Sequence, residues 1–82
     1  MQKIIYSNNY KYLLQLLKSY RKKANLTQKE LADKLDVNQS LISKIESGER
    51  KINLIELIMI FKVMNFNPLE IIEKFLNSWI DE

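Results

Sequence analysis

Four hydrogen-bonding side chains lie close together in one short stretch of this sequence and are the first candidates for a chemical role. They are Gln39, Ser40, Ser43 and Lys44. Ile42 and Ile45 are spaced as on the buried face of a helix. At about 100° per residue, Ser40, Lys44 and Ser47 fall on the opposite face. Amide, hydroxyl and ammonium groups can hydrogen-bond to the edges of DNA bases, so this face fits the major groove. The alternative is an ordinary solvated helix face.

The composition argues against several other kinds of site. The 82 residues include no cysteine and no histidine, which removes disulfides, thiolate metal sites and the commonest general base. Glu70 and Glu73 have helical spacing but no metal-ligand cluster beside them. We therefore expect no enzyme activity, no catalytic residue, no metal and no cofactor. No apolar run approaches the roughly 20 residues of a membrane span, and no signal peptide is recognisable, so we expect a cytoplasmic protein without a membrane partner.

The charge is divided unevenly along the chain, although the net charge is only +3. Residues 1–51 carry eleven Lys or Arg and five Asp or Glu, a balance of +6. Residues 52–82 carry two Lys or Arg and five Asp or Glu, a balance of −3. This division suggests a part that binds a polyanion and a part that serves packing or pairing, although ordinary scatter of surface charge explains it equally well.

The periodicity of apolar residues predicts a single all-α domain over residues 1–82. The expected helices span 9–24, 28–35, 39–47, 54–64 and 68–80. Residues 1–8 form either an N-terminal arm or, at Lys3 to Tyr6, a short strand. The helix over 54–64 is apolar nearly all round, which predicts burial on more than one side.

Residues that favour helix ends mark these boundaries. The expected N-caps are Thr27, Asn38, Asn53 and Asn67. Glu30 follows Thr27 at the spacing of a capping box, and Glu56 follows Asn53 in the same way. The expected stops are Asn25, Gly48 and Asn65, each in the left-handed conformation.

The sequence has more apolar residues than so small a domain can bury. Surplus side chains include Ile5, Tyr12 and Leu16, together with parts of the last two helices. We expect the C-terminal helix, within residues 67–80, to supply a two-fold dimer interface. The residues assigned to this interface are Phe75, Leu76, Trp79 and Ile80.

The segment LTQKELADKLDVNQSLISKIESGER resembles the helix-turn-helix of the Cro/phage-repressor (XRE-type) regulators. The matching residues are Gln28, Ala32, Val37, Ile42, Ser43, Glu46 and Gly48. The segment KINLIELIMIFKVMNFNPLEII is similar to the fourth and fifth helices of that family, and the resemblance covers roughly residues 9–76. It implies a compact, five-helix, lambda-repressor-like domain with a helix-turn-helix over residues 27–48.

The resemblance also implies roles for individual residues. Base-reading positions match Gln39, Ser40 and Lys44, with Ser43 as a secondary contact. DNA-backbone positions match Gln28, Asn38, Ser47, Arg50 and Lys51. Arg21 and Glu46 match a partly buried ion pair that orients the recognition helix. The family commonly has glycine at the positions of Asp36 and Asn25, and both residues tolerate the left-handed conformation at modest strain.

The function implied by the resemblance is sequence-specific regulation of transcription. A homodimer would bind double-stranded DNA at a pseudo-palindromic operator, reading the major groove with its third helix and regulating its own gene. The alternatives are a DNA-binding antitoxin, with a toxin as protein partner, and a restriction–modification controller protein. The sequence leaves both alternatives open.

Overall fold

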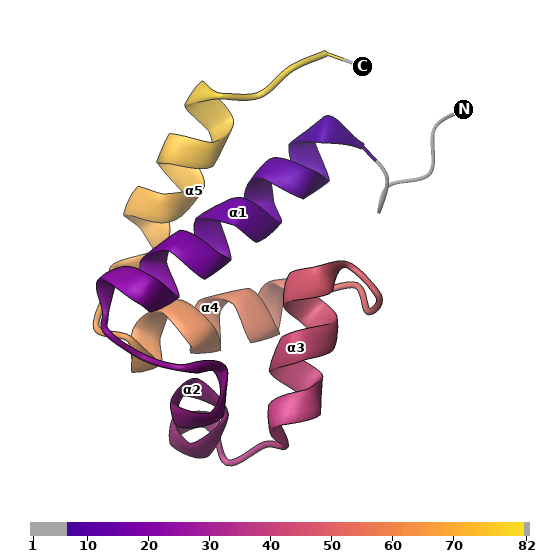
Figure 1. The fold of residues 1–82 in the computed structure, drawn as a ribbon. Coiled ribbons are helices and arrows are strands. Elements are labelled where there is room, and N and C mark those ends of the chain that lie inside the picture. The colour runs from indigo at the N-terminus through magenta and orange to yellow at the C-terminus, as the bar shows by residue number, and fades with distance from the viewer. Residues whose placement is uncertain (1–6, 82) are drawn as a thin grey trace.

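The computed structural model describes residues 7–81, and five helices with no strand account for the regular structure of that range. The helices are α1 (Asn8–Lys23), α2 (Gln28–Leu35), α3 (Gln39–Ser47), α4 (Leu54–Val63) and α5 (Pro68–Asn77) (Figure 1). The expected all-α, five-helix fold is therefore confirmed. The predicted arm or strand, including Ile5, lies outside the described residues, apart from Ser7 and Asn8.

Hydrogen bonds at the helix starts explain where the helices begin. Thr27 with Glu30 and Asn53 with Glu56 form complete capping boxes, in which each side chain bonds to the other residue's backbone N–H. The Asn67 side chain accepts from the backbone N–H of Leu69. The expected cap at Asn38 is wrong in one respect, because Asn38 occupies the N-cap position without a side-chain cap hydrogen bond.

Left-handed residues end the helices as expected. The residues with positive φ are Asn25 (59°), Asp36 (58°), Gly48 (85°) and Asn65 (64°). In this conformation the backbone turns sharply, so that each following helix starts in a new direction. At the end of α2, for example, the N–H of Asp36 bonds to the carbonyl of Asp33, and the N–H of Val37 bonds to that of Ala32.

Two helix ends are set by side chains that the sequence analysis did not consider. Helix α1 begins at Asn8 because the side chain of Ser7, which the sequence analysis missed, accepts from the backbone N–H of Tyr10. Helix α5 ends at Asn77 and not at residue 80. The chain leaves the helix because the Asn9 side chain donates to the Ile80 carbonyl at 2.6 Å and accepts from its N–H at 2.9 Å.

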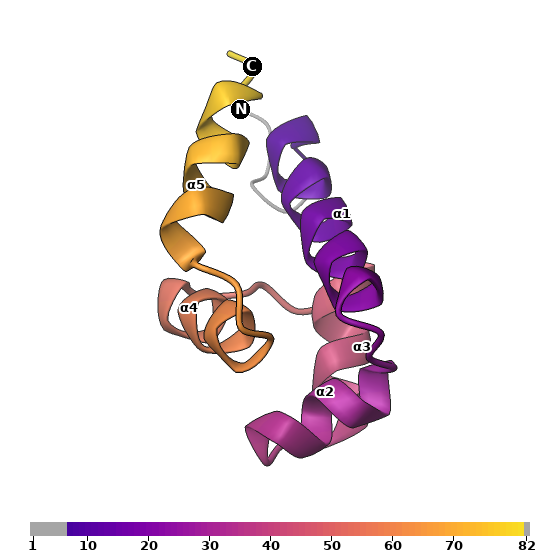
Figure 2. The same ribbon diagram turned by 90° about the vertical axis from the view of Figure 1, so that its left-hand side faces the viewer.

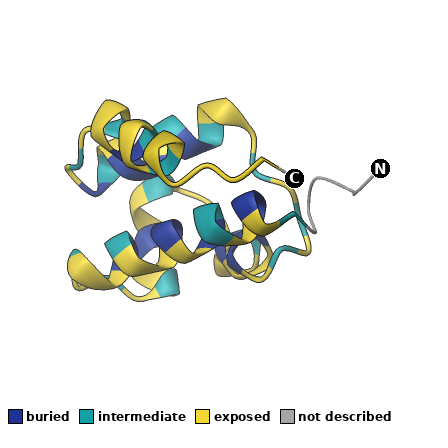
Figure 3. Cartoon of the chain, turned by 90° about the horizontal axis from the view of Figure 1, so that it is seen from above, coloured by how far each residue is buried: buried dark blue, intermediate teal, exposed yellow. Residues whose placement is uncertain are grey.

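The core lies where α1, α2, α3 and α4 meet, with Ile71 added from α5, and Figure 3 shows buried residues on the inward faces of the helices. Its most deeply buried large side chains are Leu31, Ile42 and Phe61, from α2, α3 and α4. Such a core fixes α2 and α3 relative to each other.

Two predictions about burial are wrong. Leu16, expected to be surplus, is 5% exposed, and it lines the same hollow as Tyr20 of α1 and Lys74 of α5. Helix α4 is not covered on more than one side, since Leu54, Ile55 and Met59 are more than half exposed. The described chain has no further element to cover that face of α4.

Candidate nucleic-acid interface

Helix α3 has one buried face and one polar face. Ile42 and Ile45 are each 2% exposed and pack into the core. The five polar residues outside that face are all exposed: Gln39, Ser40, Ser43, Lys44 and Ser47. Among the described residues, no other helix covers them. The hydroxyl of Ser47 donates to the Lys44 carbonyl at 3.1 Å, which fixes it against the helix.

A buried carboxylate joins α3 to α1 and α2. Glu46 accepts from Arg21 Nε at 2.7 Å and from Arg21 Nη2 at 3.0 Å, so the ion pair is bidentate. The side chains of Arg21 and Glu46 are 9% and 4% exposed. Arg21 Nη1 also donates to the Leu26 carbonyl at 2.8 Å, which ties the loop before α2 to the same cluster. The structure thus brings together the two residues expected to orient the recognition helix.

Gln28, the first residue of α2, belongs to the same cluster. Its Nε2 donates to Glu46 Oε1 at 3.0 Å, a contact that the sequence analysis missed. The amide carries a second N–H, and the side chain is half-buried, so it retains a donor for another group. The helix N-terminus also favours an anion. The expected contact of Gln28 with a DNA phosphate stays a prediction.

The electrostatics of Glu46 follow from this arrangement. Burial opposes ionisation of the carboxyl, but hydrogen bonds from Arg21 and Gln28 outweigh it, so the pKa of Glu46 is lowered from its ordinary value of 4.5. The carboxylate is therefore charged at neutral pH, and it neutralises the guanidinium of Arg21.

The loop after α3 places Arg50 and Lys51 differently. Arg50 Nη1 and Nη2 donate to the two carboxylate oxygens of Glu56 at 2.9 and 2.8 Å. This hydrogen-bonded pair raises the pKa of Arg50 and lowers that of Glu56. Lys51 and Asn38 are exposed, and Lys51 has no ion pair among the described residues. The DNA contacts expected of these residues stay predictions.

The contact between Arg50 and Glu56 was missed by the sequence analysis. Glu56 was expected only as the second half of the capping box with Asn53, and it does fill that role. Its second partner lies six residues before it, on the other side of a helix start. A basic residue just upstream of a capping box is the signal that could have found it.

The residues assigned to a dimer interface fall into two groups. Leu76, Trp79 and Ile80 are each more than half exposed. Phe75 is half-buried, since its ring stacks on Tyr12 at 6.3 Å between centroids and meets Trp79 edge-on at 5.8 Å. The exposed group leaves an apolar surface at the C-terminal end of α5.

Other kinds of site are not found in the described part of the chain. Residues 7–81 hold no group of three or more acidic, histidine or cysteine residues placed to bind a metal. No helix in that range combines the length and the apolar character needed to cross a membrane.

Comparison with known proteins places this geometry in a family. A family model described as helix-turn-helix matches residues 17–71, which is more than half of the chain and includes all of α2 and α3. The chain belongs to the XRE-type helix-turn-helix family. This XRE-type chain is similar to a solved structure described as an XRE-family like protein from Pseudomonas syringae pv. tomato str. DC3000. The two are 35% identical over 88% of each chain, with a TM-score of 0.83. A search of curated proteins found no significant match. The family is one of DNA-binding regulators, so α2 and α3 of this XRE-type chain are its helix-turn-helix.

Proposed function

We propose that this XRE-family protein is a homodimeric regulator of transcription that reads a specific sequence in double-stranded DNA with α3. The observation that carries the proposal is the exposed polar face of α3. The orientation of this helix is fixed by contacts on its buried face. Ile42 and Ile45 anchor the helix in the core, and the ion pair of Arg21 and Glu46 fixes its C-terminal half.

The chemistry of that face supports readout of base edges. Gln39 can pair with adenine through two hydrogen bonds, and Lys44 can donate to the acceptors of guanine. Ser40 and Ser43 have short side chains, which allow the helix backbone to approach the bases closely. Gln28, at the start of α2, would hold a phosphate and so set the depth of α3 in the groove.

The test uses DNA that the protein itself selects from a random pool. We expect the wild-type protein to enrich one sequence, and to bind that duplex more tightly than a scrambled duplex in fluorescence anisotropy. The double variant Gln39→Ala/Lys44→Ala should lose about 1–3 kcal/mol of this preference for each good base contact. Its affinity for the scrambled duplex should fall by less, because phosphate contacts are independent of sequence.

A matched control separates base reading from general loss of charge. Lys34 is an exposed lysine near the C-terminal end of α2. The variant Lys34→Ala therefore removes the same charge as Lys44→Ala without changing α3. We expect Lys34→Ala to leave the preference unchanged. An unchanged preference in the Gln39→Ala/Lys44→Ala variant would contradict the assignment of α3.

The exposed apolar residues at the end of α5 support the dimeric part of the proposal. Two copies related by a two-fold axis would present two α3 helices to half-sites one helical turn apart, about 34 Å. The selected sequence should then be pseudo-palindromic. The DNA upstream of the protein's own gene is the natural duplex to test for autoregulation.

A further inference from the structure

Helix α1 is the only described helix that carries basic residues and no acidic residue. Its basic residues are Lys11, Lys18, Arg21, Lys22 and Lys23. Arg21 is neutralised by Glu46. Within residues 7–81, none of the four lysines has a carboxylate at ion-pair distance. Helix α1 therefore keeps four uncompensated positive charges.

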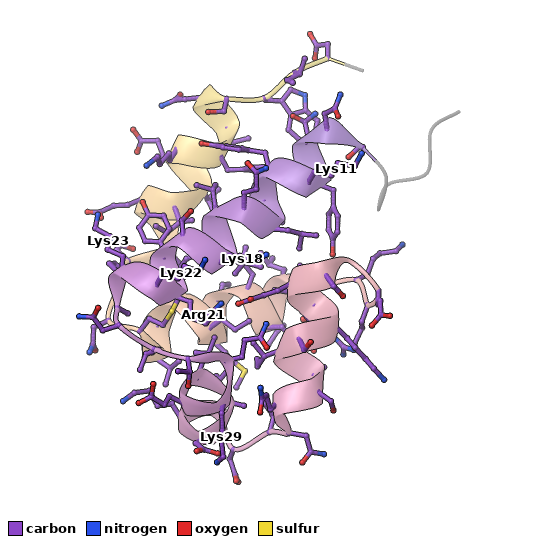
Figure 4. The ribbon with its side chains drawn as sticks, in the orientation of Figure 1. Lys11, Lys18, Arg21, Lys22, Lys23 and Lys29 are labelled. Atoms are coloured by element: carbon purple, nitrogen blue, oxygen red, sulfur yellow. The ribbon has the colours of Figure 1, made fainter. Side chains whose placement is uncertain are left out.

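Three of these lysines lie on one face of the helix. Lys11, Lys18 and Lys22 are separated by seven and four residues, which puts them within about 40° of one another around the helix axis. All three are exposed, and they follow α1 along the side that faces the viewer in Figure 4. We call them the lysine ridge. Lys23 lies off the ridge, because its Nζ is 5.5 Å from the Tyr20 ring centre, which Lys74 of α5 also approaches at 5.6 Å.

The lysine ridge adjoins the helix-turn-helix. Lys18 lies three residues, about one helical turn, before Arg21, whose guanidinium binds Glu46 of α3. Figure 2 shows α1 and the start of α2 on one side of the molecule, with α4 and α5 on the other. The ridge and the start of α2, where a phosphate is expected, therefore belong to the same side.

We propose that Lys11, Lys18 and Lys22 bind phosphates of the DNA that flanks the half-site contacted by α3. The inference rests on the proposed function, because α3 must first fix the direction of the DNA. From Lys11 to Lys22 the ridge spans twelve residues, about 16.5 Å along the helix axis, which corresponds to about five base pairs of duplex. Lysine suits this role, since a flexible stem carrying a point charge reaches a phosphate without reading the base.

The experiment measures how binding depends on salt. The probe is the duplex that the wild-type protein selects, made in a short form and in a long form with about ten arbitrary base pairs added at each end. One variant replaces the ridge, Lys11→Gln/Lys18→Gln/Lys22→Gln. The control variant, Lys23→Gln/Lys62→Gln/Lys74→Gln, replaces three exposed lysines off the ridge. Each variant lowers the net charge from +3 to zero, because three lysines are neutralised.

The plot of log K against log salt should be steeper for the wild-type protein on the long duplex than on the short one. On the long duplex, the ridge variant should lower that slope by about 2.7 for each bound protomer, since each phosphate contact contributes about 0.9. Its sequence preference should not change. The control variant should keep the difference between the two duplexes.

Two results would overturn the inference while leaving the proposed function intact. One is equal slopes of the wild-type protein on the short and long duplexes. The other is an equal loss of slope in the two variants, which would mean that only the total charge matters. If the wild-type protein selects no sequence at all, the proposed function fails first, and the lysine ridge fails with it.

Discussion

Glu46 connects three helices through one carboxylate, because it belongs to α3 and accepts hydrogen bonds from Arg21 of α1 and Gln28 of α2. Its two oxygens are shielded from water, so they depend on these donors. A buried charge that loses its partner is strongly destabilising, whereas the intact pair is satisfied. The orientation of the recognition helix therefore depends on a few polar atoms.

Removal of the guanidinium tests this dependence. We expect Arg21→Met to lower the free energy of unfolding by about 3–5 kcal/mol, because Glu46 would stay buried without its main partner. Urea unfolding followed by circular dichroism measures the loss. Arg21→Lys, which keeps the charge but not the bidentate geometry, should lose less. A loss below about 1 kcal/mol for Arg21→Met would mean that the pair behaves like an exposed one.

Acid should weaken the fold partly through Glu46. Its pKa is lowered in the folded protein, so its contribution to stability is fully present above the unfolded value, near 4.5, and is lost as the pH falls through the lower folded value. We expect the free energy of unfolding to be steady above about pH 5 and to fall below it. Glu46→Gln should show a smaller fall over that range. Some fall should remain in the variant, since the pKa values of Glu30 and Glu56 are also lowered.

A control distinguishes Glu46 from carboxylates in general. Glu73 is exposed on α5 and has no ion pair among the described residues. Glu73→Gln should follow the wild-type pH profile. If the free energy of unfolding depends on pH identically in the wild-type protein and in Glu46→Gln, then Glu46 does not contribute to the loss of stability in acid.

At the scale of the elements, residues that act on their own backbone were predictable. Asn25, Gly48 and Asn65 were recognised as left-handed stops from their types alone, because the chemistry is local, whereas Asp36 was recognised only through the family resemblance. The capping boxes were predictable for the same reason, since their partners are three residues apart. Local rules of this kind fixed four of the five helix starts to the residue.

Features that depend on distant partners were not predictable in this way. The end of α5 is set by Asn9, which lies 71 positions from Ile80 in the sequence. The buried Leu16 lines a hollow with Lys74 of α5, which is far from it in the sequence. At the candidate site, the types of residue on α3 were recognised from their spacing, whereas the hydrogen bond between Gln28 and Glu46 required the packing of α2 against α3.

The N-caps of the helix-turn-helix offer a direct comparison. Thr27→Ala should lower the stability by about 1 kcal/mol, because the capping box of α2 loses its side-chain acceptor. Asn38→Ala should lower the stability by only a few tenths of the loss in Thr27→Ala, since the Asn38 side chain makes no cap hydrogen bond. Thermal unfolding of the two variants measures the difference. Equal losses would show that Asn38 does cap α3 in solution.

At the scale of the whole molecule, the exposed apolar side chains of the described residues include two groups that compete for the dimer interface. One is at the end of α5, with Leu76, Trp79 and Ile80, and the other is on α4, with Ile55 and Met59. The first is the one we assign to the dimer. The surface on α4 was not predicted, because the apolar sequence of this helix predicts burial on more than one side.

A charge placed on each surface decides between them. Leu76 and Ile55 are 61% and 65% exposed, so either can be replaced by glutamate without opening the core. We expect Leu76→Glu to shift the protein from dimer to monomer in analytical ultracentrifugation and to weaken binding to the selected duplex. Ile55→Glu should leave the dimer intact. The reverse result would move the interface to α4.

The two hydrogen bonds between Asn9 and Ile80 also bear on how the chain folds. They join positions 71 residues apart, so they close a loop that contains every helix of the described chain except the first residue of α1. Closing so long a loop costs more entropy than forming contacts between neighbouring helices. This closure should therefore follow the rate-limiting step. Asn9→Ala should speed unfolding in stopped-flow measurements while leaving the folding rate nearly unchanged.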